Sequence, residues 1–89
     1  MKVGVIGSGI MGNGIAQVFA TSGFEVVLVD VNGELLEKAK QTITKSLGKI
    51  LGKQGKENEV EDVLNRLTFT TDKGQFKDAD LVVEAITNL

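Results

Sequence analysis

A glycine-rich turn between a predicted strand and a predicted helix is the feature that most constrains this chain. Residues 3–6 read Val-Gly-Val-Ile, and the turn that follows reads Gly-Ser-Gly-Ile-Met-Gly over residues 7–12. A second apolar run, FEVVLV, covers residues 24–29 and is followed directly by Asp30. This order predicts a strand–helix–strand unit whose two strands are parallel, with a tight turn in front of the helix.

Each glycine of the turn has its own physical reason to be there. Gly7 allows the chain to leave the strand sharply, with a positive φ that a Cβ would disfavour. Gly9 leaves no side chain between the backbone and a bound pyrophosphate. Gly12, together with Gly14 one turn later, lets the helix pack closely against the strand. Since a helix begins with free N–H groups and a partial positive charge, the turn predicts a dinucleotide site.

Asp30 indicates which dinucleotide is bound. A carboxylate at the end of the second strand accepts hydrogen bonds from the adenosine ribose hydroxyls and repels a 2′-phosphate. The next residues are Val31 and Asn32, so no arginine follows to attract that phosphate. The sequence therefore predicts NAD rather than NADP. Two simpler interpretations stay open: a tight turn that binds nothing, and an aspartate that only prepares entry into the next helix.

Composition excludes several classes of function. A chain of 89 residues makes one domain. It has no cysteine and no histidine, which excludes disulfides, a thiolate nucleophile and the commonest acid–base residue, and we expect no metal site. The net charge of −2 gives no reason to expect nucleic acid as a partner. With no signal peptide and no run of membrane-spanning length, we expect a cytoplasmic protein without membrane contact.

The remaining sequence alternates predicted helices and strands. A helix is predicted over residues 10–22, with packing residues Ile10, Gly14, Ala16, Val18 and Ala20. Asn32 is predicted to cap a long helix, and an apolar stripe runs along that helix through Leu36, Ala39, Ile43, Leu47 and Ile50. A short helix follows from about residue 57. Strands are predicted over residues 67–70 and 81–86, joined by a loop over 71–77 with at most one helical turn.

This alternation predicts an α/β fold. It corresponds to half of a doubly wound Rossmann fold, with a parallel sheet of about four strands in the order 3-2-1-4 and right-handed crossovers. The helical pair between the second and third strands is longer than a plain crossover requires.

The chain closely resembles the N-terminal NAD-binding domain of L-3-hydroxyacyl-CoA dehydrogenases, which include the bacterial 3-hydroxybutyryl-CoA dehydrogenases. The resemblance covers the whole chain and rests on GSGIMGNGIA at residues 7–16, GFEVVLVD at 23–30, the long helical pair, and DADLVVEA at 78–85. It implies an NAD-dependent oxidation of 3-hydroxyacyl-CoA, with 3-hydroxybutyryl-CoA as the expected substrate, to 3-ketoacyl-CoA.

The resemblance also implies which residues contact the ligands. The implied cofactor contacts are Gly7, Gly9, Ile10, Met11, Gly12, Asp30, Ala85 and Ile86. The implied coenzyme A contacts are Ser46 and Lys53, which offer a hydroxyl and a point charge to a phosphate. A solvated serine and lysine on an amphipathic helix explain the same two residues equally well. One departure is that Asn88 directly follows Thr87, without the glutamate that family members place before that asparagine.

The family places its catalytic serine, histidine, glutamate and asparagine beyond the matched region. We therefore expect residues 1–89 to be a single partial dinucleotide-binding domain, without the C-terminal half or the substrate and dimerisation domain. We expect no catalytic residue here, binding of NAD or ADP-ribose without catalysis, and a homo-oligomer formed through the exposed edge of the 81–86 strand. Two alternatives stay open: a stand-alone or engineered minimal nucleotide-binding module without enzymatic activity, and a structural protein whose turn binds nothing.

Overall fold

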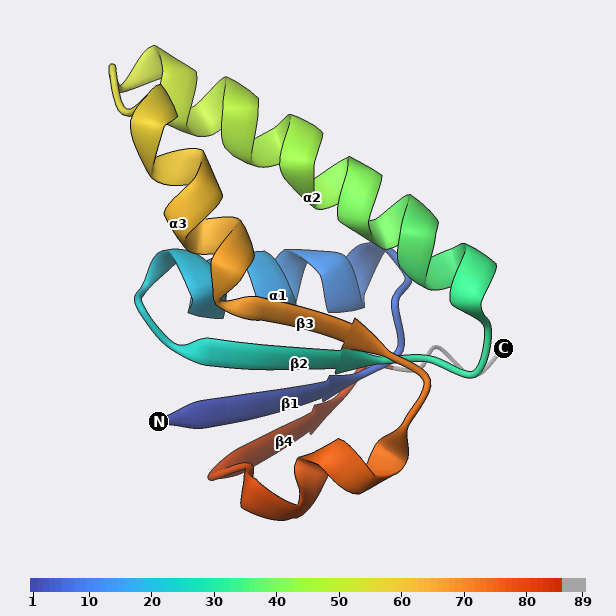
Figure 1. The fold of residues 1–89 in the computed structure, drawn as a ribbon. Coiled ribbons are helices and arrows are strands. Elements are labelled where there is room, and N and C mark those ends of the chain that lie inside the picture. Colours follow the sequence, from blue (N-terminus) through green and yellow to red (C-terminus); the bar gives the residue numbers. More distant parts are fainter. Residues whose placement is uncertain (86–89) are drawn as a thin grey trace.

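A four-stranded parallel sheet organises residues 1–85, the part of the chain that this computed structural model describes (Figure 1). In chain order the elements are β1 (Lys2–Ile6), α1 (Ile10–Thr21), β2 (Glu25–Val29), α2 (Gly33–Lys53), the 3-10 turn η1 (Glu57–Glu59), α3 (Val60–Asn65), β3 (Leu67–Thr70), the 3-10 turn η2 (Lys73–Asp78) and β4 (Leu81–Glu84). The strands lie in the order β3-β2-β1-β4, which confirms the predicted order.

The register of β1 and β2 brings the glycine turn to the end of the second strand. Ile6 lies beside Val29, so the residues that follow each strand leave the sheet at the same edge. The backbone N–H of Gly7 donates to the carbonyl of Val29 at 2.8 Å, which extends the pairing by one bond into the turn. Gly7 and Asp30 are neighbours for this reason, although 23 positions separate them in the sequence.

The second strand is buried on both faces, as its continuous apolar run predicts. Val26 and Leu28 lie in the main core with Val3 and Val5 of β1, on the face covered by α1. Because successive side chains alternate across a strand, Val27 and Val29 point to the opposite face, where they are also buried.

Helix α1 packs against the sheet through small residues spaced four apart. Gly12, Ala16 and Ala20 are buried, which confirms the two alanines as packing residues. The predicted packing of Ile10, Gly14 and Val18 is wrong: Ile10 and Val18 are 95% and 65% exposed, and Gly14 has no atom within 4 Å of where its Cβ would stand. Residues two positions apart lie about 200° around a helix, so burying one stripe exposes the other.

Helix α2 buries the predicted stripe, with one correction at its end. Leu36, Ala39, Ile43 and Leu47 are buried, but the next buried residue is Leu51, while Ile50 is 45% exposed. Helical periodicity places positions 50 and 51 on either side of the stripe, so it does not choose between them. The choice comes from α3, which packs beside the end of α2 and brings Val63 into the same core as Leu51.

The start of α2 is capped as predicted. Asn32 is the N-cap, and its side-chain oxygen accepts a hydrogen bond from the backbone N–H of Glu34 at 2.7 Å. No helix in residues 1–85 is both long and apolar enough to cross a membrane.

The 3-10 turn η2 covers the second face of the sheet, away from the three helices in Figure 1. The absence of a side chain on Gly4 makes room for Phe76, because a Cβ there would overlap the phenylalanine ring. The side chain of Asp72 caps the turn by accepting from the N–H of Gly74 at 2.8 Å. The predicted loop therefore holds a longer ordered turn than expected, and its first residue, Lys73, reaches the carboxyl edge of the sheet.

Candidate cofactor site

A pocket of about 380 Å³ opens where the carboxyl ends of β1 and β2 meet. It is lined by Ile6, Gly7, Ser8, Gly9, Val29, Asp30, Val31, Lys73 and Ala85. Four of the predicted cofactor residues, Gly7, Gly9, Asp30 and Ala85, are thus brought together in one place. The pocket lies where dinucleotides bind in open parallel sheets, outside the carboxyl ends of the strands.

The glycine turn is held rigidly at two of its three glycines. Gly7 has φ of 103°, which confirms that the chain leaves the strand in a conformation favouring glycine. Gly12 lies so close to the turn that a Cβ on it would overlap the carbonyl oxygen of Gly7. The predicted close packing of helix on strand is therefore confirmed at Gly12, and it is wrong at Gly14, which faces open space.

Gly9 differs from the other two because the described residues leave space beside it. It is the N-cap of α1, with φ of −71°, and apart from its chain neighbours no atom of residues 1–85 lies within 4 Å of the position its Cβ would take. The protein itself therefore leaves room for a side chain at this position. The open space lies at the N-terminus of a twelve-residue helix, where free N–H groups attract an anion.

The Asp30 carboxylate accepts three hydrogen bonds, two of which join it to the glycine turn. Its Oδ2 accepts from the backbone N–H of Ser8 at 2.9 Å and from the Ser8 hydroxyl at 2.6 Å. Its Oδ1 accepts from the backbone N–H of Val31 at 2.6 Å. The carboxylate is therefore oriented before any ligand arrives, and each oxygen keeps capacity for a further donor.

These contacts also determine the ionisation of Asp30. Burial opposes the charged form, but hydrogen bonds from the Ser8 hydroxyl and from the backbone of Ser8, Val31 and Asn32 outweigh it. They hold the pKa of Asp30 below its usual value of 3.8. At neutral pH the carboxylate is ionised, as ribose recognition and the repulsion of a 2′-phosphate both require.

Acidification is expected to remove the contribution of this carboxylate to stability. A lowered folded-state pKa stabilises the fold above the unfolded-state pKa, and the effect is lost as pH falls through the folded-state pKa. The free energy of unfolding of the wild type should exceed that of Asp30→Asn by about 1 kcal/mol near neutral pH. The two free energies should converge well below pH 4. Urea unfolding of both proteins across this range measures the difference, and a difference independent of pH would contradict the assignment.

Ser8 is a residue of this pocket that our sequence analysis did not single out. It is only 7% exposed, and both its N–H and its hydroxyl are committed to Asp30. The available signal was a hydroxyl residue between the first two glycines, in a fingerprint that ends in an acid. Lys73 was also missed, because nothing local to residues 71–77 indicates that they reach this edge.

The remaining predicted cofactor residues are Ile10, Met11, Ala85 and Ile86, and the structure places them differently from one another or does not describe them. Ile10 and Met11 lie in the first turn of α1, 95% and 60% exposed, and neither lines the pocket. Their contact with a cofactor stays a prediction. Ala85 is buried, and its N–H donates to the carbonyl of Ile6 at 2.8 Å. Ile86 lies outside the described residues, as does the departure at Thr87 and Asn88.

The two residues implied for coenzyme A lie on α2, apart from the cofactor pocket. The Ser46 hydroxyl is half-buried and accepts a hydrogen bond from the side-chain amide of Gln17 at 2.9 Å, which joins α2 to α1. Gln17 also lines a shallow groove of about 240 Å³ between these helices. Lys53 is exposed in the last turn of α2, seven residues beyond Ser46, which is about two helical turns.

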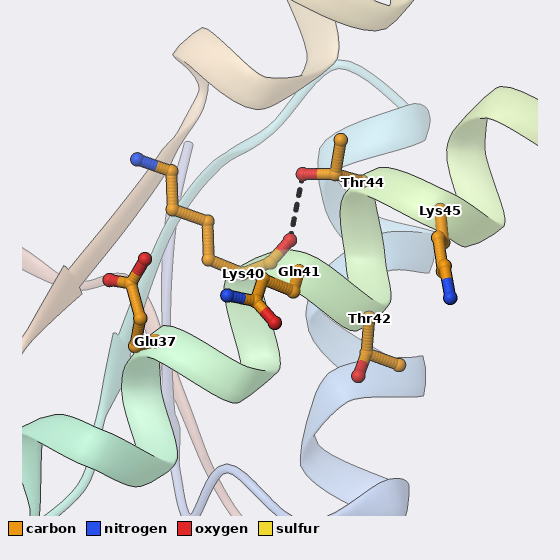
Figure 2. Close-up of a pocket in the computed structure, with 6 residues that line it drawn as sticks. All are labelled: Glu37, Lys40, Gln41, Thr42, Thr44 and Lys45. Carbon is orange, nitrogen blue, oxygen red and sulfur yellow. Dashed lines mark hydrogen bonds between the residues drawn. The ribbon is translucent and has the colours of Figure 1, made fainter.

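A larger hollow on the outer side of α2 does not form a comparable site. Figure 2 shows its six lining residues, Glu37, Lys40, Gln41, Thr42, Thr44 and Lys45, which all belong to this one helix. The hydrogen bond drawn there, from the Thr44 hydroxyl to the Lys40 carbonyl at 2.7 Å, is internal to the helix. Among residues 1–85, no second element contributes to the lining of this hollow. Within residues 1–85, no group of acidic residues is arranged to hold a metal ion.

Comparison with known proteins supports the same assignment. Residues 2–88 match the family described as the 3-hydroxyacyl-CoA dehydrogenase NAD binding domain. A probable 3-hydroxybutyryl-CoA dehydrogenase of Deinococcus radiodurans is 56% identical over 97% of this chain and 31% of its own length. The human mitochondrial hydroxyacyl-coenzyme A dehydrogenase is 45% identical over 94% of this chain and 29% of its own length.

The fold agrees with a solved relative. The crystal structure of (S)-3-hydroxybutyryl-CoA dehydrogenase PaaH1 from Ralstonia eutropha superimposes with a TM-score of 0.92 and 36% identity, over 99% of this chain and 31% of that protein. The chain therefore spans less than a third of the length of the relatives it matches.

Proposed function

Because the chain belongs to the 3-hydroxyacyl-CoA dehydrogenase family, as its NAD-binding domain, we propose that it holds NAD for the oxidation of a 3-hydroxyacyl-CoA to the 3-ketoacyl-CoA. The expected substrate is 3-hydroxybutyryl-CoA. The observation that carries this proposal is the single pocket in which the open Gly9 turn and the ionised Asp30 meet. On this proposal residues 1–89 are one partial dinucleotide-binding domain, and the catalytic groups belong to other parts of the enzyme.

The residues of the pocket divide the work of binding. The open side of Gly9 admits a pyrophosphate to the first N–H groups of α1. Asp30, already oriented by Ser8, accepts from the two adenosine ribose hydroxyls. Gly12 allows the helix to pack closely against the turn. When bound, NAD supplies the acceptor for the hydride of the alcohol carbon.

Coenzyme A is proposed to contact Ser46 and Lys53. The Ser46 oxygen accepts from Gln17, so its own proton remains available for a phosphate or carbonyl oxygen. Lys53 adds an exposed positive charge on the same helix. This pair lies outside the NAD pocket, so the two ligands would be bound by separate parts of the domain.

Calorimetric titration of the 89-residue chain tests these assignments. NAD and ADP-ribose should bind with similar affinity, and Asp30→Ala should weaken both by about tenfold or more, because charge-assisted hydrogen bonds are lost. Lys53→Ala should weaken coenzyme A and leave NAD unchanged. NAD binding without coenzyme A binding would favour the minimal nucleotide-binding module, and NADH formation from 3-hydroxybutyryl-CoA by this chain alone would overturn the expected lack of catalysis.

We further propose that the partner of this chain is a second copy of itself, which associates along β4. Leu81 and Val82 are 44% and 45% exposed, and in the described residues β4 pairs only with β1. A second copy could pair with this edge. Light scattering should show a mass above that of the monomer, and Val82→Lys should reduce it; a monomeric mass at high concentration would contradict the proposal.

A cytoplasmic location also stays a prediction, since the named relatives include mitochondrial proteins.

A further inference from the structure

We propose that Lys73 is a second determinant of cofactor specificity, providing a positive charge for a 2′-phosphate that Asp30 otherwise keeps out. The inference rests on the proposed binding of the adenosine ribose beside Asp30. It concerns a lysine that the glycine fingerprint does not contain, and that reaches the site only through the path of η2.

The pocket contains two charged residues of opposite sign. Among the nine lining residues, Asp30 carries the negative charge and Lys73 the positive one. A single carboxylate beside the ribose would repel a 2′-phosphate strongly. A cation within the same small pocket offsets part of that repulsion and offers up to three donors to phosphate oxygens.

Lys73 is brought to Asp30 by the path of the chain after β3. The backbone N–H of Asp30 donates to the carbonyl of Thr70 at 3.3 Å, so the end of β3 lies directly beside the acid. The Thr70 hydroxyl then accepts from the N–H of Asp72 at 3.0 Å, which turns the chain back toward the sheet. Lys73 follows immediately as the first residue of η2.

The position of η2 is itself held by packing. Phe76 lies against the bare backbone of Gly4 in β1, and Asp72 caps the turn through Gly74. The lysine backbone is therefore anchored on both sides, while its side chain is exposed. An anchored backbone with a free ammonium group can reach a phosphate at a small cost in conformational entropy.

The hydrogen bonds that Asp30 accepts come from Ser8 and Val31 and not from Lys73. The Lys73 ammonium group therefore remains available to an anionic ligand. The two residues act in opposition on the same position of the cofactor: the acid selects a ribose with free hydroxyls, and the lysine favours a phosphorylated one.

The test compares ADP-ribose with 2′-phospho-ADP-ribose as probes, in the 89-residue chain and its variants. Asp30→Asn removes the negative charge, keeps the shape of the side chain, and should raise the relative affinity for the 2′-phosphorylated probe by about tenfold. Adding Lys73→Ala to that variant should remove most of the gain. The matched control is Lys77→Ala, an exposed lysine on the same 3-10 turn that does not line the pocket.

The outcomes separate this inference from the proposed function. If ADP-ribose binds and Lys73→Ala changes both probes equally, or neither, the lysine does not discriminate and the inference is wrong. If Lys77→Ala has the same effect as Lys73→Ala, the effect is general electrostatics rather than a local contact. If wild type fails to bind ADP-ribose at all, the proposed function and this inference fall together.

Discussion

Replacing Gly12 by alanine is expected to destabilise the fold by about 3 kcal/mol, a large part of the stability of a chain of this size. The added Cβ would overlap the carbonyl oxygen of Gly7. That oxygen cannot withdraw easily, because Gly7 is held by its bond to Val29 and by a φ of 103°. The helix would have to move away from the strand, and the NAD site would be distorted with it.

The matched control for this variant is Gly14, two positions further along α1 and on its exposed side. Gly14→Ala adds the same methyl group to the same helix, where no other part of residues 1–85 lies within 4 Å. It should stabilise the protein by up to about 1 kcal/mol through helix propensity. Because the chain has no tryptophan or tyrosine, unfolding in urea is followed by far-ultraviolet circular dichroism. Similar midpoints for the two variants would contradict the close packing of Gly12.

Replacing Gly9 by alanine should have the opposite effect: the fold should stay intact and the binding of NAD should be lost. Its φ of −71° and ψ of −169° suit any residue, and its Cβ would enter empty space. The change should alter stability by no more than about 1 kcal/mol, the difference between glycine and alanine at an N-cap. NAD affinity should fall about 100-fold or more, since the methyl group would separate the pyrophosphate from the backbone N–H groups.

Titration with NAD and thermal unfolding of the same samples measure both effects. Gly48→Ala is the control, since it also adds a methyl group in open space, but on α2, and it should leave NAD affinity unchanged. Retained NAD binding by a folded Gly9→Ala protein would mean that the pyrophosphate does not approach this part of the turn. The Gly12→Ala and Gly9→Ala variants together separate the residue that holds the turn in place from the residue that the ligand approaches.

Much of the fold could be predicted because it depends on signals within short stretches of sequence. The turn after β1, the Asn32 cap and the apolar run of β2 each involve residues that are near neighbours in the chain. The strand order is that of half a doubly wound Rossmann fold, which the glycine turn and the alternation of strands and helices indicate. Gly7, Gly9 and Asp30 could likewise be placed at one edge, because parallel strands end at the same side of a sheet, and the family resemblance implied Ala85 at the same site.

The errors arose where two local solutions were equally good. Both stripes of α1 are periodic, one through Ile10, Gly14 and Val18 and the other through Gly12, Ala16 and Ala20. Only the sheet decides which one is buried, because the smaller residues allow the closer approach. At the end of α2, Ile50 and Leu51 fit the helical period equally, and the packing of α3 chose Leu51.

The sequence by itself determined the α/β fold, the glycine turn, the acid that favours NAD and the family to which the chain belongs, because each is encoded in a contiguous pattern of residue types. The tertiary structure alone decided that Ser8 binds Asp30, that Ser46 joins Gln17, and that Lys73 enters the pocket. The two hydrogen bonds link residues 22 and 29 positions apart, and Lys73 lines the pocket 43 positions after Asp30. Such contacts form only when strand register and helix packing bring distant segments together, so no local pattern records them.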